Sequence, residues 1–131
     1  MDMEITFPGG KKVEAAWKEH PILTDQPVKD GGEGSAPAPF DLFLASVGTC
    51  GAYYVLAFCE ARKIPAEGVR VTLSLTKDPK KKMVSRMDLR IHLPAGFPEK
   101  YRDAVVKAAR FCAVTKHLYD PPAIEVEAVA G

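Results

Sequence analysis

The sequence predicts one α+β domain, residues 1–131, in which helices cover an antiparallel sheet. Three observations favour this class. Short segments that alternate apolar and polar residues flank turns rich in Gly and Pro, two longer segments space their apolar residues as helices do, and the two kinds follow each other without a repeat or a linker. With 131 residues, 47% of them hydrophobic, the chain can bury a single core.

The first 38 residues are expected to form strands and then a loop. Residues 4–7 and 12–17 flank a Pro-Gly-Gly-Lys turn, a third short strand is expected at 21–24, and together they make residues 1–24 the N-terminal strands. Residues 25–38 hold too few apolar side chains to order themselves alone. A loop of this length in a compact domain indicates a functional or interface role.

A long central helix is predicted over residues 39–64. Pro39 suits a first helical turn, since its missing N–H would be unpaired there, and apolar residues occur on most sides of the segment, which indicates burial nearly all round. Residues 67–93 follow as a strand pair, because 69–76 and 83–93 both alternate apolar and polar residues.

The last third predicts a second helical region at 98–118 and a final strand at 123–129. Tyr101, Val105, Ala108 and Cys112 recur at helical spacing and mark one continuous face, so we expect Cys112 on the buried side of a helix. A further turn is expected around residues 115–118. Residues 124–129 alternate as a strand does.

Charge and cysteine content exclude several classes of function. Lys and Arg total 18 against 17 Asp and Glu, so no broad basic field exists for nucleic acid or an anionic membrane. The first residues carry acid rather than the basic start of a signal peptide, and no apolar segment is expected to span a bilayer, which predicts a cytoplasmic protein. Three cysteines in a reducing compartment then point to packing, metal binding or thiol redox chemistry.

Helix phase separates the three cysteines. At about 100° per residue, Cys50 and Cys59 fall on opposite faces of the central helix, so Cys59 is interpreted as a small buried hydrophobe. Cys112 comes from another element and could meet Cys50. Gly48 and Gly51, which flank Thr49 and Cys50, could admit a substrate; close packing of another helix explains them equally well.

No metal site is expected. His117 follows Cys112 closely, but no Cys-x-x-Cys or His-x-x-x-His spacing occurs, and a structural zinc site commonly uses such pairs. The three lysines at 80–82 are interpreted as a solvated turn.

Two motifs resemble those of the OsmC/Ohr family, in its OsmC-like branch. Residues 39–50, PFDLFLASVGTC, look like the family's helix-opening motif with its Pro, acid, Leu and Cys, and Phe111-Cys112-Ala113-Val114 followed by Leu118 is similar to the family's Cys-x-Val signature. The order of the motifs and the pattern of strands and helices agree over nearly the whole chain. The resemblance implies an intertwined homodimer with sites at the subunit interface, a long central helix that bears Cys50 and a second helix that bears Cys112.

The resemblance also implies a thiol peroxidase that needs no metal or prosthetic group. Cys50 matches the attacking cysteine, which becomes a sulfenic acid, Cys112 matches the resolving cysteine, and an external dithiol would reduce the resulting disulfide. An organic hydroperoxide would suit apolar surroundings. The expected substrate pocket consists of Phe40, Phe43, Val47, Thr49, Tyr53 and Tyr54.

The chain departs from the family's peroxide-reducing members in its charged residues. The position of their glutamate is Phe40, and Asp41 matches the acid of the OsmC-like branch, although a carboxylate there also suits a helix N-terminus. No Arg precedes Arg62, so the family's N-terminal arginine has no counterpart, and only lysines could replace it: Lys11, Lys12, Lys18 or Lys29. The alternative is a non-catalytic member whose pocket binds a small apolar ligand or senses oxidants.

Overall fold

The computed structural model describes all 131 residues, and the chain divides into two compact units, Met1–Ala45 and Ser46–Gly131. Each unit contains one antiparallel sheet. A long helix, α1 (Pro39–Ala61), begins in the first unit and continues into the second. The mixed helix-and-sheet class is therefore confirmed, while the expectation of a single domain stays a prediction.

The first unit holds the three expected N-terminal strands. Strands β1 (Glu4–Gly9), β2 (Lys12–Trp17) and β3 (His20–Thr24) pair antiparallel in that order. Gly9 and Gly10 close the first hairpin with φ angles of 146° and 57°, which residues with a side chain rarely adopt. The pairing of β1 with β2 confirms the hairpin predicted from the two strand segments and the Gly-containing turn between them.

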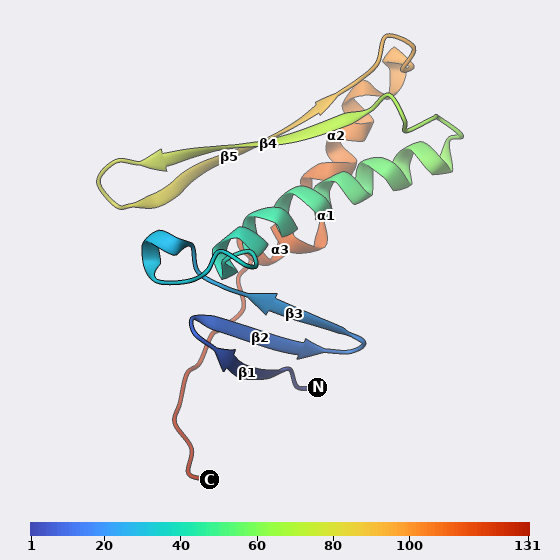
Figure 1. Cartoon of the computed structure of the whole chain (residues 1–131). Coiled ribbons are helices and arrows are strands. Elements are labelled where there is room, and N and C mark those ends of the chain that lie inside the picture. Colours follow the sequence, from blue (N-terminus) through green and yellow to red (C-terminus); the bar gives the residue numbers. More distant parts are fainter. The chain divides into compact units, whose positions relative to one another are not determined.

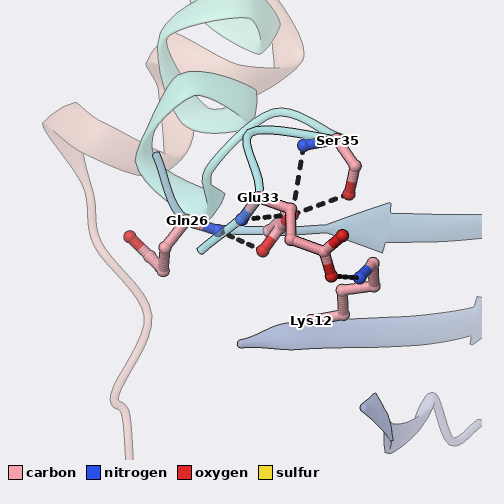
Figure 2. Close-up of polar contacts among 5 residues, drawn as sticks. Lys12, Gln26, Glu33 and Ser35 are labelled. Carbon is pink, nitrogen blue, oxygen red and sulfur yellow. Dashed lines mark hydrogen bonds and ion pairs between the residues drawn. The ribbon is translucent and has the colours of Figure 1, made fainter. Parts of the chain in front are cut away.

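A polar network orders the loop that follows β3. Asp25 is 1% exposed, and its carboxylate accepts hydrogen bonds from the Ser35 hydroxyl (2.6 Å) and from the N–H groups of Gln26 (2.7 Å), Ser35 (3.1 Å) and Glu33 (3.3 Å). Glu33 also pairs with Lys12 of β2 at 2.6 Å (Figure 2). The sequence expectation considered only apolar residues and missed that one buried carboxylate can fix this loop.

These donors also explain the acidity of Asp25. The Ser35 hydroxyl and N–H, helped by the N–H groups of Gln26 and Glu33, lower the pKa of Asp25 to about 2, although burial acts in the opposite direction. The loop contains one short 3-10 turn, Val28–Asp30. Gly32 is required where the loop folds back, because a Cβ there would lie 2.0 Å from the Gln26 carbonyl oxygen.

In the second unit, a two-stranded ribbon packs on α1. Strands β4 (Arg70–Asp78) and β5 (Met83–His92) pair antiparallel, as expected, and form the long twisted ribbon beside α1 in Figure 1. Leu73 pairs with Leu89 across the ribbon. A Cβ on Gly51 would lie 2.6 Å from Leu89 Cδ2, so the glycine lets the helix approach the ribbon closely. The ribbon is thus the nearest neighbour of Gly51, and a second helix lies close as well, because the Ala109 carbonyl oxygen of α2 (Arg102–Arg110) is 3.7 Å from the same Cβ position.

The core of the second unit lies between α1, the ribbon and the helices that follow. Its buried members come from α1, from α2 (Arg102–Arg110) and from the segment between β5 and the short 3-10 turn Glu99–Tyr101. They are Val55, Phe58, Cys59, Phe97, Val105 and Ala109. At the end of α1 the Arg62 guanidinium lies 3.7 Å from the Phe58 ring centroid and adds a cation–π contact to this core.

The expected end of the central helix differs from the structure. Helix α1 ends at Ala61 rather than near residue 64, because Lys63 adopts a left-handed φ of 55° and the Ile64 N–H bonds back to the Cys59 carbonyl at 2.9 Å. Pro65 also disfavours a helical Ile64.

The expected final strand at 123–129 does not form. Residues 121–131 have no regular secondary structure, and Ile124, Val126 and Val129 are 83%, 92% and 80% exposed. A strand requires a neighbour to receive its backbone hydrogen bonds, and neither sheet includes this segment.

The expectation that no apolar segment could span a bilayer is wrong for α1. With 23 residues and an apolar composition it is long enough to cross a membrane, by a test that the core helix of a soluble protein also passes.

Candidate functional site

Two of the three cysteines meet in the second unit. Cys50 lies on α1 and is partly exposed, whereas Cys112 is 0% exposed. The Cys50 side chain is a hydrogen-bond partner of the Cys112 sulfur, and both side chains are free thiols. The structure therefore brings together the pair that sequence analysis singled out, one residue partly exposed and the other buried.

Cys112 does not lie on a helix face, contrary to the sequence prediction. Helix α2 ends at Arg110, and Cys112, with an extended backbone, is the N-cap of a separate helix, α3 (Ala113–Tyr119). The physical cause of the break is Thr115, whose hydroxyl donates to the backbone carbonyls of Arg110 (2.9 Å) and Cys112 (3.2 Å). Such side-chain bonds compete with continued helix. The predicted region 98–118 is thus two helices, and the turn expected at 115–118 belongs to the second.

The capping geometry places hydrogen-bond donors around the Cys112 sulfur. The Thr115 N–H donates to it at 3.5 Å, and the Thr115 hydroxyl lies 3.4 Å away. Burial is the largest influence and by itself raises the pKa of Cys112, but the Thr115 hydroxyl and N–H, the Cys50 thiol and the Val114 N–H together outweigh it. The pKa of Cys112 is consequently lower than that of an ordinary thiol, which favours the reactive thiolate.

Cys59 is equally enclosed but has a different environment. It is 0% exposed and packs in the apolar core, where burial raises the pKa of its thiol. Its position on the opposite face of α1 from Cys50 agrees with the helix-phase argument. Cys59 is a small hydrophobic core residue.

An apolar cavity of about 380 Å³ lies beside the pair. It is lined by the ribbon, by α2 and α3, and by Val47, which precedes Cys50 by less than one helical turn. Thr115, which contacts the Cys112 sulfur, also lines the cavity. Its full lining is Val47, Leu73, Met87, Leu89, Ile91, Val106, Ala109, Arg110, Thr115, Leu118 and Tyr119.

Of the six residues predicted to form the substrate pocket, only Val47 lines this cavity. Tyr53 is 62% exposed and contacts Tyr54 edge to face, at 5.6 Å between centroids. Thr49 is an exposed residue of α1. Apolar character on α1 did not identify the cavity, because its walls come mainly from the ribbon, α2 and α3.

The remaining predicted residues belong to the first unit. Asp41 accepts a hydrogen bond from the Ala38 N–H at 3.1 Å, so it satisfies backbone at the start of α1. Phe40 and Phe43 stack on each other with centroids 5.5 Å apart. This placement gives Asp41 the helix-terminus role that sequence analysis kept open.

Sequence reasoning missed the hydrogen bonds that Thr115 and Asp25 make. Thr115 follows Cys112 by three residues, the spacing between an N-cap residue and the backbone N–H that donates to its side chain. This spacing indicates a cap only if a helix is known to begin after Cys112. For Asp25 the available signal was an acid at the end of a strand, before a loop that contains Ser35.

Known structures share this fold. The solved structure of a Psychrobacter arcticus protein assigned to the osmotic stress induced and detoxification response is 22% identical, with a TM-score of 0.71, and the match covers 87% of this chain and 85% of that one. An organic hydroperoxide resistance protein OsmC from Legionella pneumophila is 25% identical, with a TM-score of 0.52 and coverage of 90% and 89%.

A third similar structure carries a ligand. It comes from a protein of Vibrio cholerae assigned to organic hydroperoxide resistance, with captopril bound in one of its active sites. The identity is 21%, the TM-score is 0.60, and the match covers 92% of this chain and 86% of that one. No functionally curated protein matches the chain by sequence.

A family model places the chain among its sequence relatives. The model of the OsmC-like protein family matches residues 32–127, which include α1 with Cys50, the ribbon, and the break with Cys112. The match extends over well more than half of the chain. The chain therefore belongs to the OsmC-like protein family.

Proposed function

We propose that the protein reduces organic hydroperoxides with the Cys50–Cys112 pair, as part of a defence against oxidative stress. The observation that carries this proposal is the contact between a partly exposed thiol, Cys50, and an enclosed thiol of lowered pKa, Cys112, beside an apolar cavity. Relatives named for organic hydroperoxide resistance support it.

The exposure of each sulfur decides its role. Cys50, which solvent can reach, attacks the distal oxygen of the hydroperoxide and cleaves the O–O bond; the alcohol leaves with the thiol proton, and Cys50 becomes a sulfenic acid. The Cys112 thiolate then attacks the Cys50 sulfur and expels hydroxide, which leaves a disulfide. An external dithiol returns both thiols by exchange, so the cycle uses no metal or prosthetic group.

The cavity indicates the kind of hydroperoxide. Aliphatic side chains from α1, the ribbon and α3 form most of its walls, and they favour an apolar body over a small polar peroxide. The other residues predicted for the site do not line this cavity and remain proposed contributors to substrate binding or catalysis. They are Asp41, Phe40, Phe43, Thr49, Tyr53 and Tyr54.

We also propose a cytoplasmic homodimer with its sites at the subunit interface. Exposed apolar side chains on β1 and in the C-terminal segment support a second copy, because Phe7 is 81% and Val126 is 92% exposed. Sedimentation equilibrium tests this directly, and a monomer at micromolar concentration would contradict it.

The decisive experiment is stoichiometric oxidation by an organic hydroperoxide followed by a thiol count. Wild-type protein should lose two thiols for each hydroperoxide consumed. Cys112→Ser should leave Cys50 as a trappable sulfenic acid, and Cys50→Ser should lose none rapidly. Cys59→Ala is the matched control and should behave as wild type. An unmodified Cys50 in excess hydroperoxide would refute the peroxidase proposal.

A second candidate is a non-catalytic protein that binds an apolar ligand or senses oxidants. Two observations favour it: no arginine precedes Arg62, and no cationic side chain contributes to the lowered pKa of Cys112. In that case calorimetry should detect binding of an apolar compound to the reduced protein, while hydroperoxide turnover with a dithiol stays at the uncatalysed rate.

A further inference from the structure

The hydrogen bonds around Cys112 converge on one residue. Thr115 contacts the Cys112 sulfur twice, through its N–H at 3.5 Å and its hydroxyl oxygen at 3.4 Å. The same hydroxyl reaches the carbonyl oxygens of Arg110 at 2.9 Å and Cys112 at 3.2 Å. No other side chain except Cys50 takes part in the hydrogen bonding that lowers the pKa of Cys112.

The hydroxyl of Thr115 can serve both protonation states of this sulfur. A hydroxyl has one proton to donate and two lone pairs to accept. Beside a Cys112 thiol, the proton goes to the Arg110 carbonyl at 2.9 Å and an oxygen lone pair accepts from the S–H. Beside a thiolate, the hydroxyl turns and donates to the sulfur, and a hydrogen bond to an anion is stronger than one to a neutral group.

The N–H of Thr115 fixes where the sulfur points. Because Cys112 is the N-cap of α3 and Thr115 is the third residue beyond it, this bond sets the side chain against the helix start. Cys112 is 0% exposed, so if a substitution removes a hydrogen-bond donor from its sulfur, water cannot take the place of that donor.

We propose that Thr115 is a positioning residue for the resolving step, holding the Cys112 sulfur as a thiolate directed at Cys50. The inference rests on the proposed peroxidase function. Because Thr115 also lines the cavity, its role in the second step is measured separately from the oxidation of Cys50. In that second step the Cys112 thiolate forms the S–S bond and hydroxide leaves the Cys50 sulfenic acid.

The test compares Thr115→Val, which keeps the shape but lacks the hydroxyl, with Thr115→Ser, which restores it. Each is mixed rapidly with one equivalent of tert-butyl hydroperoxide, and intact mass follows the sulfenic acid and the disulfide. Once Cys50 is oxidised, Thr115→Val should accumulate sulfenic acid and convert it into the disulfide about tenfold more slowly than the wild type, the scale of one charge-assisted hydrogen bond. Thr115→Ser should resolve as wild type does.

A matched control makes the same chemical change elsewhere. Thr76→Val alters an exposed threonine of β4 and should leave both steps unchanged. Should Thr115→Val have a reduced melting temperature, Thr115→Ala provides the same comparison. Disulfide formation at the wild-type rate in the hydroxyl-free variants, or a slow Thr115→Ser, would overturn the inference.

A second measurement separates this inference from the proposed function. The ultraviolet absorbance of thiolate in the reduced protein needs no hydroperoxide, and at neutral pH it should decrease in Thr115→Val and persist in Thr115→Ser. If Cys50 is never oxidised but the absorbance changes as expected, the peroxidase proposal fails and the placement of the Cys112 thiolate by Thr115 stands. Equal absorbance in all variants refutes the role of Thr115.

Discussion

Asp25 in the first unit and Cys112 in the second are two enclosed acids with similar surroundings. Asp25 is 1% exposed and Cys112 is 0% exposed. Backbone N–H groups and one nearby hydroxyl, that of Ser35 or Thr115, surround each of them. In both cases these donors lower the pKa in spite of burial.

The two acidic groups differ in the interactions that are still open to them. The Asp25 carboxylate accepts four hydrogen bonds within its own loop, and its role is to order that loop. The Cys112 sulfur has a second thiol, Cys50, as a neighbour and can form a bond with it. Cys59 provides the reference: burial without such donors raises its pKa. Hydrogen-bond donors, not depth, therefore decide in which direction the pKa of an enclosed acid moves.

The largest expected effect is the loss of turnover in Cys112→Ser. Serine is a preferred N-cap, so α3 should keep its amide protection against hydrogen exchange, but no disulfide with Cys50 can form. With an external dithiol present, steady-state hydroperoxide consumption should fall to the background rate. Retained turnover in this variant would show that Cys112 is not required and would remove the contrast with Asp25.

Asp25→Asn should have the next largest effect, on stability rather than chemistry. The Asp25 pKa of about 2 lies below the ordinary value of 3.8, so its ionisation stabilises the fold above about pH 4, and this contribution is lost as the pH falls toward 2. Chemical denaturation between pH 2 and 5 should show that wild-type protein loses stability over this range and that Asp25→Asn lacks this part of the pH dependence. Cys50 should still be oxidised in the variant. Identical pH profiles would contradict a structural role for this carboxylate.

A moderate effect is expected for Cys59→Ala, which tests the third enclosed acid. Removal of a buried sulfur from the core should reduce the free energy of unfolding by about 1–3 kcal/mol. The kinetics of disulfide formation should not change. A slower Cys50 oxidation in this variant, measured by mass spectrometry, would mean that Cys59 is coupled to the pair after all.

The smallest effects are expected for substitutions of Gly48 and Gly51, which change the packing of α1 beside Cys50 and leave the hydrogen bonds of Cys112 in place. On Gly48 a Cβ would make ordinary contact with Leu73 at 3.9 Å, so Gly48→Ala should stabilise α1 by about 1 kcal/mol. On Gly51 a Cβ would meet Leu89 Cδ2 at 2.6 Å and push this side chain into the cavity that it lines. Gly51→Ala should gain no stability and should oxidise more slowly with a bulky hydroperoxide than with a small one. Equal melting temperatures for the two variants would contradict this packing.

Periodicity and turn residues were sufficient to predict the elements whose determinants are local. The alternation of Leu73, Leu89 and their neighbours predicted the ribbon, and Pro39 indicated the start of α1. Helix phase placed Cys59 in the core and away from Cys50. Each of these features depends on residues near in sequence.

The features that sequence analysis missed depend on contacts that periodicity does not encode. The spacing of Tyr101, Val105, Ala108 and Cys112 suggested one continuous helix, but a side-chain hydrogen bond from Thr115 ends α2 before Cys112. The cavity is built from five elements, α1, β4, β5, α2 and α3, so apolar residues on α1 alone could not locate it. The alternation of apolar and polar residues at 124–129 is compatible with a strand, but a strand forms only where the edge of another strand accepts its backbone hydrogen bonds.

The most direct test of the account is to map the disulfide after one equivalent of organic hydroperoxide. Peptide mass spectrometry should find Cys50 joined to Cys112 within the protein and Cys59 as a free thiol. A Cys50–Cys59 bond, or a Cys50 that stays reduced while hydroperoxide remains in excess, would contradict the account.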